Sequence, residues 1–186
     1  MKQTKFRDNA FTYKNAHLSK IDLNEETAKI LSGFLEKPKG FLLYLGSPGC
    51  GKTYFCAALM NYLAEKKKRY FYNTERDFFA NLKQSMNETA TSPEYEIELM
   101  QDLDWLILDD IGSQRADNLT DWQRGCLFDL IDGRSQSDTL VTVITSNHFM
   151  DDFKENFEPR FYDRLAEIRN TIIELRCPSL RQVYTR

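Results

Sequence analysis

The sequence predicts an α/β fold in which a five-stranded parallel sheet lies between helices. Short apolar runs alternate along the chain with longer segments that have helical periodicity. The apolar runs are continuous, which is typical of strands buried on both faces of a parallel sheet. A glycine-rich turn, GSPGCGKT, joins the first run to the next helical segment. Strands that alternate with helices in this way predict parallel pairing.

The first half of the chain predicts a capped helix, a buried strand and a second helix. Asn24 precedes EETAKILSGFLEK, whose early acids and spaced apolar residues favour a helix that ends before Pro38 and Gly40. The run FLLYL at 41–45 follows as the first strand. A helix over 52–66 and a second strand, RYFYN, over 69–73 come next.

The remaining elements continue the alternation, with two helices between the second and third strands. Thr74 and Ser92-Pro93 each open one of these helices. The later elements are a strand over 105–110, a helix over 120–132, a strand over 139–147, a helix over 151–169 and a strand over 171–177.

Composition predicts one cytoplasmic globular domain. The 186 residues are 41% hydrophobic and 28% charged, with a net charge of −3, which excludes a disordered or membrane chain. We expect a lead-in segment with a helix over 1–40 and a single domain over 41–186. No signal sequence or membrane span is apparent. The four cysteines form no CxxC pair, so we expect reduced thiols rather than a zinc site or a disulfide framework.

The segment from Gly46 to Thr53 matches the phosphate-binding pattern G-x-x-x-x-G-K-[ST]. Small residues let successive backbone amides turn inward around phosphate oxygens. Lys52 would reach the terminal phosphates of ATP, and Thr53 would ligate Mg²⁺. An ordinary glycine-rich turn is the alternative. The predicted nucleotide-contacting residues are Gly46, Ser47, Pro48, Gly49, Cys50, Gly51, Lys52 and Thr53.

The run LILDD places two carboxylates at the end of the third predicted strand. Mg²⁺ bound to a triphosphate prefers hard oxygen ligands, so Asp109 is a second metal-ligand candidate, directly or through water. Asp110 is then the candidate to polarise the attacking water. The alternative is a pair of acidic turn residues of the kind that often follow strands.

Two further motifs supply candidate catalytic groups. Asn147, at the end of VITSN, could orient water without adding charge, although a plain strand-ending turn explains it equally well. The segment PRFYDRL places Arg160 and Arg164 four residues apart on one helical face. A guanidinium can neutralise a transferring phosphoryl group. The alternative for this pair is a solvated face with helix salt bridges.

Taken in order, GSPGCGKT, LILDDIGSQR, VITSN, FYDRL and PSLRQ resemble the AAA+ ATPases of the DnaC-type helicase-loader and IstB-type transposition-helper group. The resemblance spans about residues 40–182 and implies the ASCE type of P-loop NTPase. It implies that Arg164 is an arginine finger on the ATP of a neighbouring subunit. It also implies that Arg181 contacts phosphate in its own subunit, although Leu180 replaces the family's tyrosine.

The resemblance also assigns the two helices between the second and third strands to an insertion that lies along single-stranded DNA. Phe78, Phe79, Lys83 and Gln84 are the local candidates, and core packing is the alternative for the two phenylalanines. The short segment before residue 41 implies a compact, phage-type loader, or one that binds its helicase in another way. The short segment after the last strand predicts no C-terminal helical lid.

The sequence therefore predicts an ATP- and Mg²⁺-dependent loader that forms an ATP-dependent homo-oligomer on single-stranded DNA with a replicative helicase. Hydrolysis should be weak in an isolated protomer because the arginine comes from a neighbour. An IstB-like helper of a DNA transposase is the main alternative. A small-molecule kinase is a second, and a non-hydrolysing ATP-binding module is a third because Asp110 is one methylene shorter than the usual glutamate.

Overall fold

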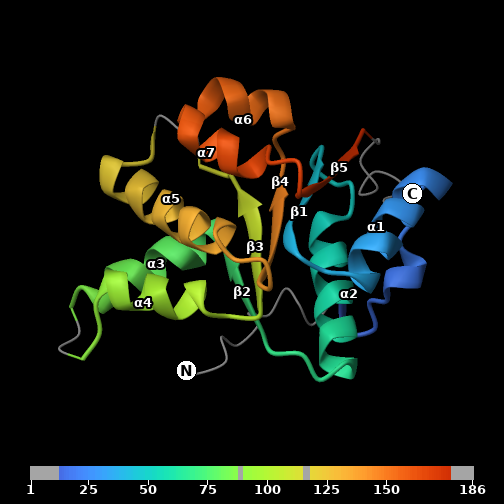
Figure 1. The fold of residues 1–186 in the computed structure, drawn as a ribbon, viewed down its shortest axis with the longest axis horizontal. Helices are drawn as coiled ribbons and strands as arrows, with labels where there is room; N and C mark the ends of the chain where they lie inside the picture. The colour runs from blue at the N-terminus through green and yellow to red at the C-terminus, as the bar shows by residue number, and fades with distance from the viewer. Residues whose placement is uncertain (1–12, 88–89, 115–117, 177–186) are drawn as a thin grey trace, which may run out of the picture.

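The computed structural model describes residues 13–87, 90–114 and 118–176. Five strands and seven α-helices alternate along these ranges in nearly the predicted order (Figure 1). The helices are α1 (Glu25–Glu36), α2 (Lys52–Glu65), α3 (Glu75–Ser85), α4 (Pro93–Gln101), α5 (Asp121–Ser135), α6 (Met150–Asn156) and α7 (Pro159–Leu165). The strands are β1 (Gly40–Gly46), β2 (Tyr70–Thr74), β3 (Trp105–Ile111), β4 (Val141–Ser146) and β5 (Thr171–Leu175), and a 3₁₀ turn, η2 (Leu18–Lys20), precedes α1.

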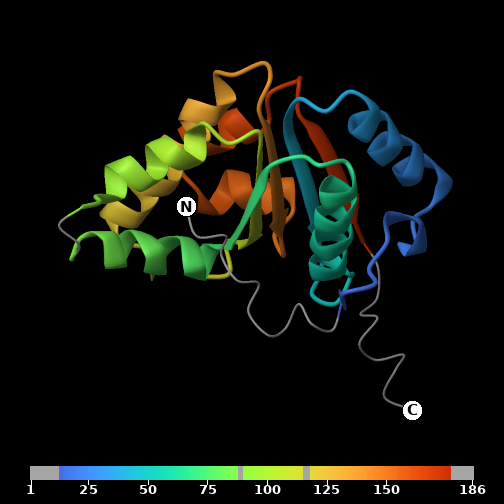
Figure 2. The same cartoon turned by 90° about the horizontal axis from the view of Figure 1, so that it is seen from below.

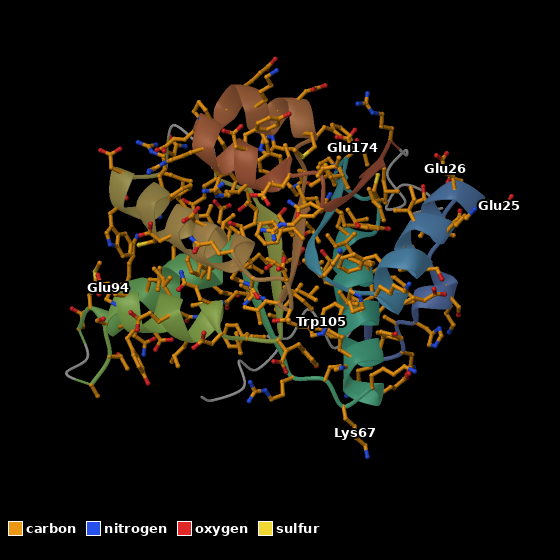
Figure 3. The ribbon with its side chains drawn as sticks, viewed as in Figure 1. Glu25, Glu26, Lys67, Glu94, Trp105 and Glu174 are labelled. Carbon is orange, nitrogen blue, oxygen red and sulfur yellow. The ribbon has the colours of Figure 1, made fainter. Side chains whose placement is uncertain are left out.

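The sheet has the strand order β2-β3-β4-β1-β5, and all of its pairings are parallel. The predicted fold class, an α/β fold with a five-stranded parallel sheet, is confirmed. β4 lies between β1 and β3, so the loops that follow these three strands meet at one edge of the sheet. Trp105 at the start of β3 and Glu174 near the end of β5 mark opposite ends of the sheet (Figure 3). The predicted site lies at the Glu174 end.

Helices cover both faces of the sheet because successive strand side chains point to opposite sides. Leu43 and Leu106 belong to a core under α3, α4, α5, α6 and α7. Their neighbours Leu42 and Ile107 belong to the other core, under α1 and α2. Figure 2 shows these two helical layers on either side of the strands. The continuous apolar runs in the sequence therefore reflect a three-layer fold.

The helices begin at the caps that the sequence predicts. The Asn24 side chain accepts a hydrogen bond from Thr27 N at 2.8 Å, and Thr74 accepts one from Asp77 N at 3.1 Å. Ser92 caps α4 with Pro93 at its first turn, and Thr120 forms a capping box at the start of α5. Each cap satisfies a backbone N–H that has no partner within the helix.

The predicted helix over 151–169 is wrong as one element. The chain forms two seven-residue helices, α6 and α7, separated at Phe157 and Glu158. Pro159 opens α7; it lacks an N–H and disfavours a helical conformation at the preceding residue. No helix follows β5 as far as residue 176, where the described part ends. Among the described helices, none is long and apolar enough to cross a bilayer.

A buried arginine that the sequence does not single out joins α4, α5 and β4. Arg134 is only 1% exposed. Its guanidinium donates to the carbonyls of Met100, Gln101, Leu103 and Val141, and to Thr142 Oγ1. Burial lowers the pKa of Arg134 to about 10, so it is still charged at neutral pH. The cation is thus held by carbonyl oxygens at the end of α4, where the helix dipole favours positive charge.

We predict that Arg134→Met lowers the free energy of unfolding by about 3 kcal/mol, because it leaves several buried carbonyls without a donor. Arg69→Met is the matched control, since its side chain is 76% exposed; it should change the value by less than about 0.5 kcal/mol. Urea denaturation of the purified variants measures both changes. Equally small decreases in the free energy of unfolding for both variants would show that the Arg134 contacts do not hold α4, α5 and β4 together.

Candidate functional site

The loop between β1 and α2 has the glycine conformations that a phosphate loop requires. Gly49 and Gly51 have φ angles of 90° and 84°, a region that side chains with a Cβ rarely adopt. Gly51 is the N-cap residue of α2, so the first helical amides follow it directly. Cys56 and Cys126 are free thiols, whereas Cys50 is disulfide-bonded. The expectation of reduced thiols is therefore wrong at Cys50.

The Lys52 side chain folds back over this loop. Its Nζ donates to Gly46 O at 2.6 Å, to Ser47 O at 3.1 Å and to Asn147 Oδ1 at 2.7 Å. The residue is 7% exposed. Neutral oxygens thus surround the ammonium group, and the anionic oxygens of a phosphate would attract it more strongly than these. Thr53 is exposed one residue further along α2.

Asp109 is held by side chains from three elements. It is 4% exposed; its Oδ1 accepts from Thr145 Oγ1 and from Cys56 Sγ, and its Oδ2 accepts from Tyr72 OH at 2.7 Å. Burial, and then the Asp109 charge, raise the pKa of Tyr72 and of Cys56 far above their ordinary values. Tyr72 and Cys56 therefore stay protonated, and both donate hydrogen bonds to the Asp109 side chain.

Asp110 occupies an irregular position in β3. The β3–β4 register shifts between Leu108 and Ile111, and Asp110 has a φ angle of 62°, which is costly for a residue with a Cβ. Its backbone N donates to Thr145 Oγ1 at 3.0 Å. Such irregularities commonly turn a side chain out of a strand at a functional site. Here the bulge sends the carboxylate of Asp110 to Asn147.

Asn147 connects the phosphate loop to the acidic pair. Its Nδ2 donates to Asp110 Oδ1 at 2.8 Å, while its Oδ1 accepts from Lys52 Nζ at 2.7 Å. The four candidates Lys52, Asp109, Asp110 and Asn147 therefore lie together at the carboxyl edge of β1, β3 and β4. Magnesium would take oxygen ligands from Asp109 and Thr53, which suit a hard cation. Within the described residues, no cluster of three or more His, Cys, Asp or Glu that could hold a metal ion is found.

The two arginines of α7 make their described contacts away from this cluster. Arg164 on α7 donates from Nε to Asp132 Oδ1 on α5 at 2.6 Å, and its Nη1 is 3.6 Å from Glu167 Oε1. No described contact joins its side chain to residues 46–53 of its own chain. Arg160 stacks on the Phe128 ring, 4.1 Å from its centroid. Arg181 lies outside the described residues.

The insertion helices correct one prediction about DNA. Phe78 and Phe79 are 0% and 2% exposed and belong to the core, so neither can stack on a base. Lys83 and Gln84 are exposed on α3. Arg76 belongs to no motif in the sequence; it is exposed on the same helix seven residues before Lys83, and helical periodicity puts the two close to one face.

Sequence reasoning also misses Glu75, a fully buried carboxylate at the start of α3. Its Oε2 accepts from Ser113 Oγ at 2.7 Å and from Gln114 N at 3.2 Å, while Oε1 has no hydrogen-bond partner among the described residues. Burial raises the pKa of Glu75; the hydrogen bonds to Ser113 and Gln114 oppose this, and the Asp110 charge adds to it. In sequence, Glu75 resembles any acid in a first helical turn, so no signal marks it.

We predict that Glu75→Gln stabilises the protein at pH 7. A carboxyl whose folded pKa is raised favours folding most below its unfolded pKa, and this contribution is lost as pH rises through the folded pKa. The free energy of unfolding of the variant minus that of wild type should therefore grow from pH 4.5 to pH 7. The exposed Glu65→Gln control should show a flat difference. A difference for Glu75→Gln that falls with pH would contradict this account.

The fold and the cluster at its carboxyl edge define the chain as a P-loop protein of the AAA+ type. Residues 6–167 match the model of the IstB-like ATP-binding protein family, and the chain belongs to that family. It is 31% identical over 140 residues to the replicative helicase loader DnaI of Bacillus subtilis, and 25% identical over 123 residues to the replicative helicase loader DnaC of Escherichia coli K12.

These alignments cover 75% and 66% of this chain but 43% and 49% of the two loaders. The chain thus spans about half the length of the curated relatives it matches. A crystal structure of the DnaC helicase loader superposes with a TM-score of 0.72 at 24% identity, covering 88% of this chain and 98% of that one. This similarity supports the fold.

Proposed function

We propose that the chain is an ATP-dependent loader of a replicative helicase. The observation that carries the proposal is the Asn147 side chain, which hydrogen-bonds to both Lys52 and Asp110. It links a phosphate-binding loop to an acidic pair at one edge of the sheet, as nucleotide hydrolysis requires. The two curated relatives are named as replicative helicase loaders, which supports the helicase as the partner.

Nucleotide binding would use the loop and its lysine. The backbone amides of residues 46–53 and the start of α2 favour an anion. Lys52 would exchange the carbonyls of Gly46 and Ser47 for the terminal phosphates. Magnesium, held by Thr53 and Asp109, would neutralise phosphate charge. Tyr72 and Thr145 keep the Asp109 carboxylate fixed through their hydroxyl groups.

Hydrolysis would depend on Asp110 and Asn147. Asp110 would accept the proton of the attacking water, and the Asn147 amide would orient that water without adding charge. Arg164 would act on the ATP of a neighbouring protomer, because its side chain has no described contact with its own loop and its helix is exposed in part. Turnover would then require an assembly.

We predict that Arg164→Ala leaves the affinity for ATP near wild type while lowering turnover at least about 10³-fold, since it removes transition-state charge and not ground-state binding. Arg160→Ala on the same helix is the matched control and should leave turnover within a few-fold of wild type. Fluorescent-nucleotide titration and steady-state ATPase assays measure the two quantities. Equal loss of affinity and turnover would contradict a finger supplied in trans.

Single-stranded DNA binding would involve the exposed face of α3. Arg76 and Lys83 are exposed there, with Gln84 beside Lys83. None of the ion pairs found in the described ranges involves Arg76 or Lys83. Basic groups on one helix face suit the phosphates of a nucleic-acid backbone, which they contact without sequence preference.

We predict that the double variant Arg76→Glu, Lys83→Glu weakens binding to single-stranded oligonucleotides and lowers the slope of log K against log salt by about 0.7 per lost phosphate contact. Lys66→Glu, Lys68→Glu makes the same charge change in the connection between α2 and β2, at the opposite end of β2 from the start of α3, and should leave the slope unchanged. Fluorescence anisotropy at several salt concentrations measures the slope for both double variants. Equal effects of the two double variants would contradict DNA binding at the exposed face of α3.

A helper of a DNA transposase is the second candidate, because the family matched over residues 6–167 is the IstB-like family. Co-purification from the native host, with and without ATP, separates the two. ATP-dependent recovery of a helicase supports the loader. Recovery of a transposase in its place would overturn the loader proposal.

A further inference from the structure

We infer that Asp132 is a positioning residue that presents Arg164 to the neighbouring protomer. This inference rests on the proposed role of Arg164 in trans. Asp132 lies in the last turn of α5, and its Oδ1 accepts the Nε–H of Arg164 at 2.6 Å. The contact joins two helices whose residues are 32 positions apart, so the local sequence around FYDRL does not reveal it.

The contact uses the donor nearest the aliphatic stem of the arginine. A guanidinium carries one N–H at Nε and four more on its two terminal amino groups. Within the described part of the chain, no hydrogen bond from either terminal amino group is found, and Nη1 forms only a 3.6 Å ion pair with Glu167 Oε1. Asp132 therefore fixes the plane of the guanidinium and leaves the phosphate-binding fork at its tip available.

The backbone at Arg164 is held as well. Asn170 Nδ2 donates to Arg164 O at 2.8 Å and to Leu165 O at 3.1 Å, while Asn170 Oδ1 accepts from Phe41 N at 3.1 Å. Asn170 thus ties the end of α7 to the start of β1, the strand that leads into the phosphate loop. The main chain is anchored to the sheet, and the side chain is anchored to α5.

The environment of Asp132 fits a positioning role. Its side chain is 26% exposed, and that of Arg164 is 40% exposed, so the pair lies at the surface where a second protomer can reach it. The Oδ2 of Asp132 accepts from Gln136 Nε2 at 3.2 Å, and its carbonyl accepts from Ser135 Oγ. A long side chain that is already oriented loses less rotamer freedom when it meets phosphate.

Asp132→Ala should lower the kcat of the assembled protein about tenfold while KM for ATP stays within twofold, because the variant's own nucleotide site is intact. In an Arg164→Ala background, the same change should lower kcat by less than twofold. Asp132→Asn, which keeps an oxygen acceptor, should give an intermediate kcat and carries the test if Asp132→Ala does not fold. Glu167→Ala, the matched removal of the other nearby acid, should leave kcat within twofold.

Mixing experiments separate this inference from the proposed function. Lys52→Ala protomers keep an intact Asp132–Arg164 pair but lack the lysine of their own site, so they should restore turnover when mixed with Arg164→Ala protomers. Lys52→Ala protomers should restore turnover to the same extent when they are mixed with Asp132→Ala protomers. A mixture of Asp132→Ala and Arg164→Ala protomers should show no recovery of turnover.

Failure of the Lys52→Ala and Arg164→Ala mixture to recover would overturn the trans arrangement and this inference with it. If turnover recovers in that mixture but not in the mixture of Lys52→Ala with Asp132→Ala, only the role of Asp132 is overturned. The role of Asp132 would equally be overturned if Asp132→Ala lowered kcat tenfold in the Arg164→Ala background, because the residue would then act independently of the arginine.

Discussion

The site depends on the position of β4 between β1 and β3. Strands in a sheet lie about 4.8 Å apart, so a side chain that follows the middle strand can reach the loops after both of its neighbours. Asn147 does so, accepting from Lys52 and donating to Asp110. A neutral amide is suited to this place because it offers an acceptor and a donor at once. An aspartate there would repel Asp110, and an aliphatic residue would leave both neighbours without this partner.

Burial sets the protonation and hydrogen bonding of the groups at the carboxyl edge of the sheet. Asp109 and Glu75 are both buried acids, but their surroundings differ. Three donors surround Asp109, and burial keeps two of them, Tyr72 and Cys56, protonated. Glu75 has an oxygen without a described partner, and its pKa is raised. Asp109 is therefore held by hydrogen bonds from three side chains, whereas Glu75 holds the loop after β3 through Ser113 and Gln114.

The elements that the sequence predicts well are those governed by local rules. Apolar runs predict the five strands, and the caps Asn24, Thr74 and Thr120 are local signals. The pattern GSPGCGKT predicts the phosphate loop. The order in which this loop, the acidic pair and Asn147 follow successive strands predicts that the three lie close together. Long-range contacts are not predicted. Arg134, Glu75 and Asp132 find partners 7 to 39 residues away, and burial of Phe78 and Phe79 depends on how α3 packs.

The most direct test is the affinity for ATP in the presence of magnesium, measured by isothermal titration calorimetry for the wild-type protein and for Lys52→Ala. The account predicts saturable binding by wild type and at least about a tenfold weaker affinity when the lysine is removed, since a charge-assisted contact to phosphate is lost. An absence of binding by wild type, or equal affinities of the two proteins, would contradict the assignment of this loop as a triphosphate site.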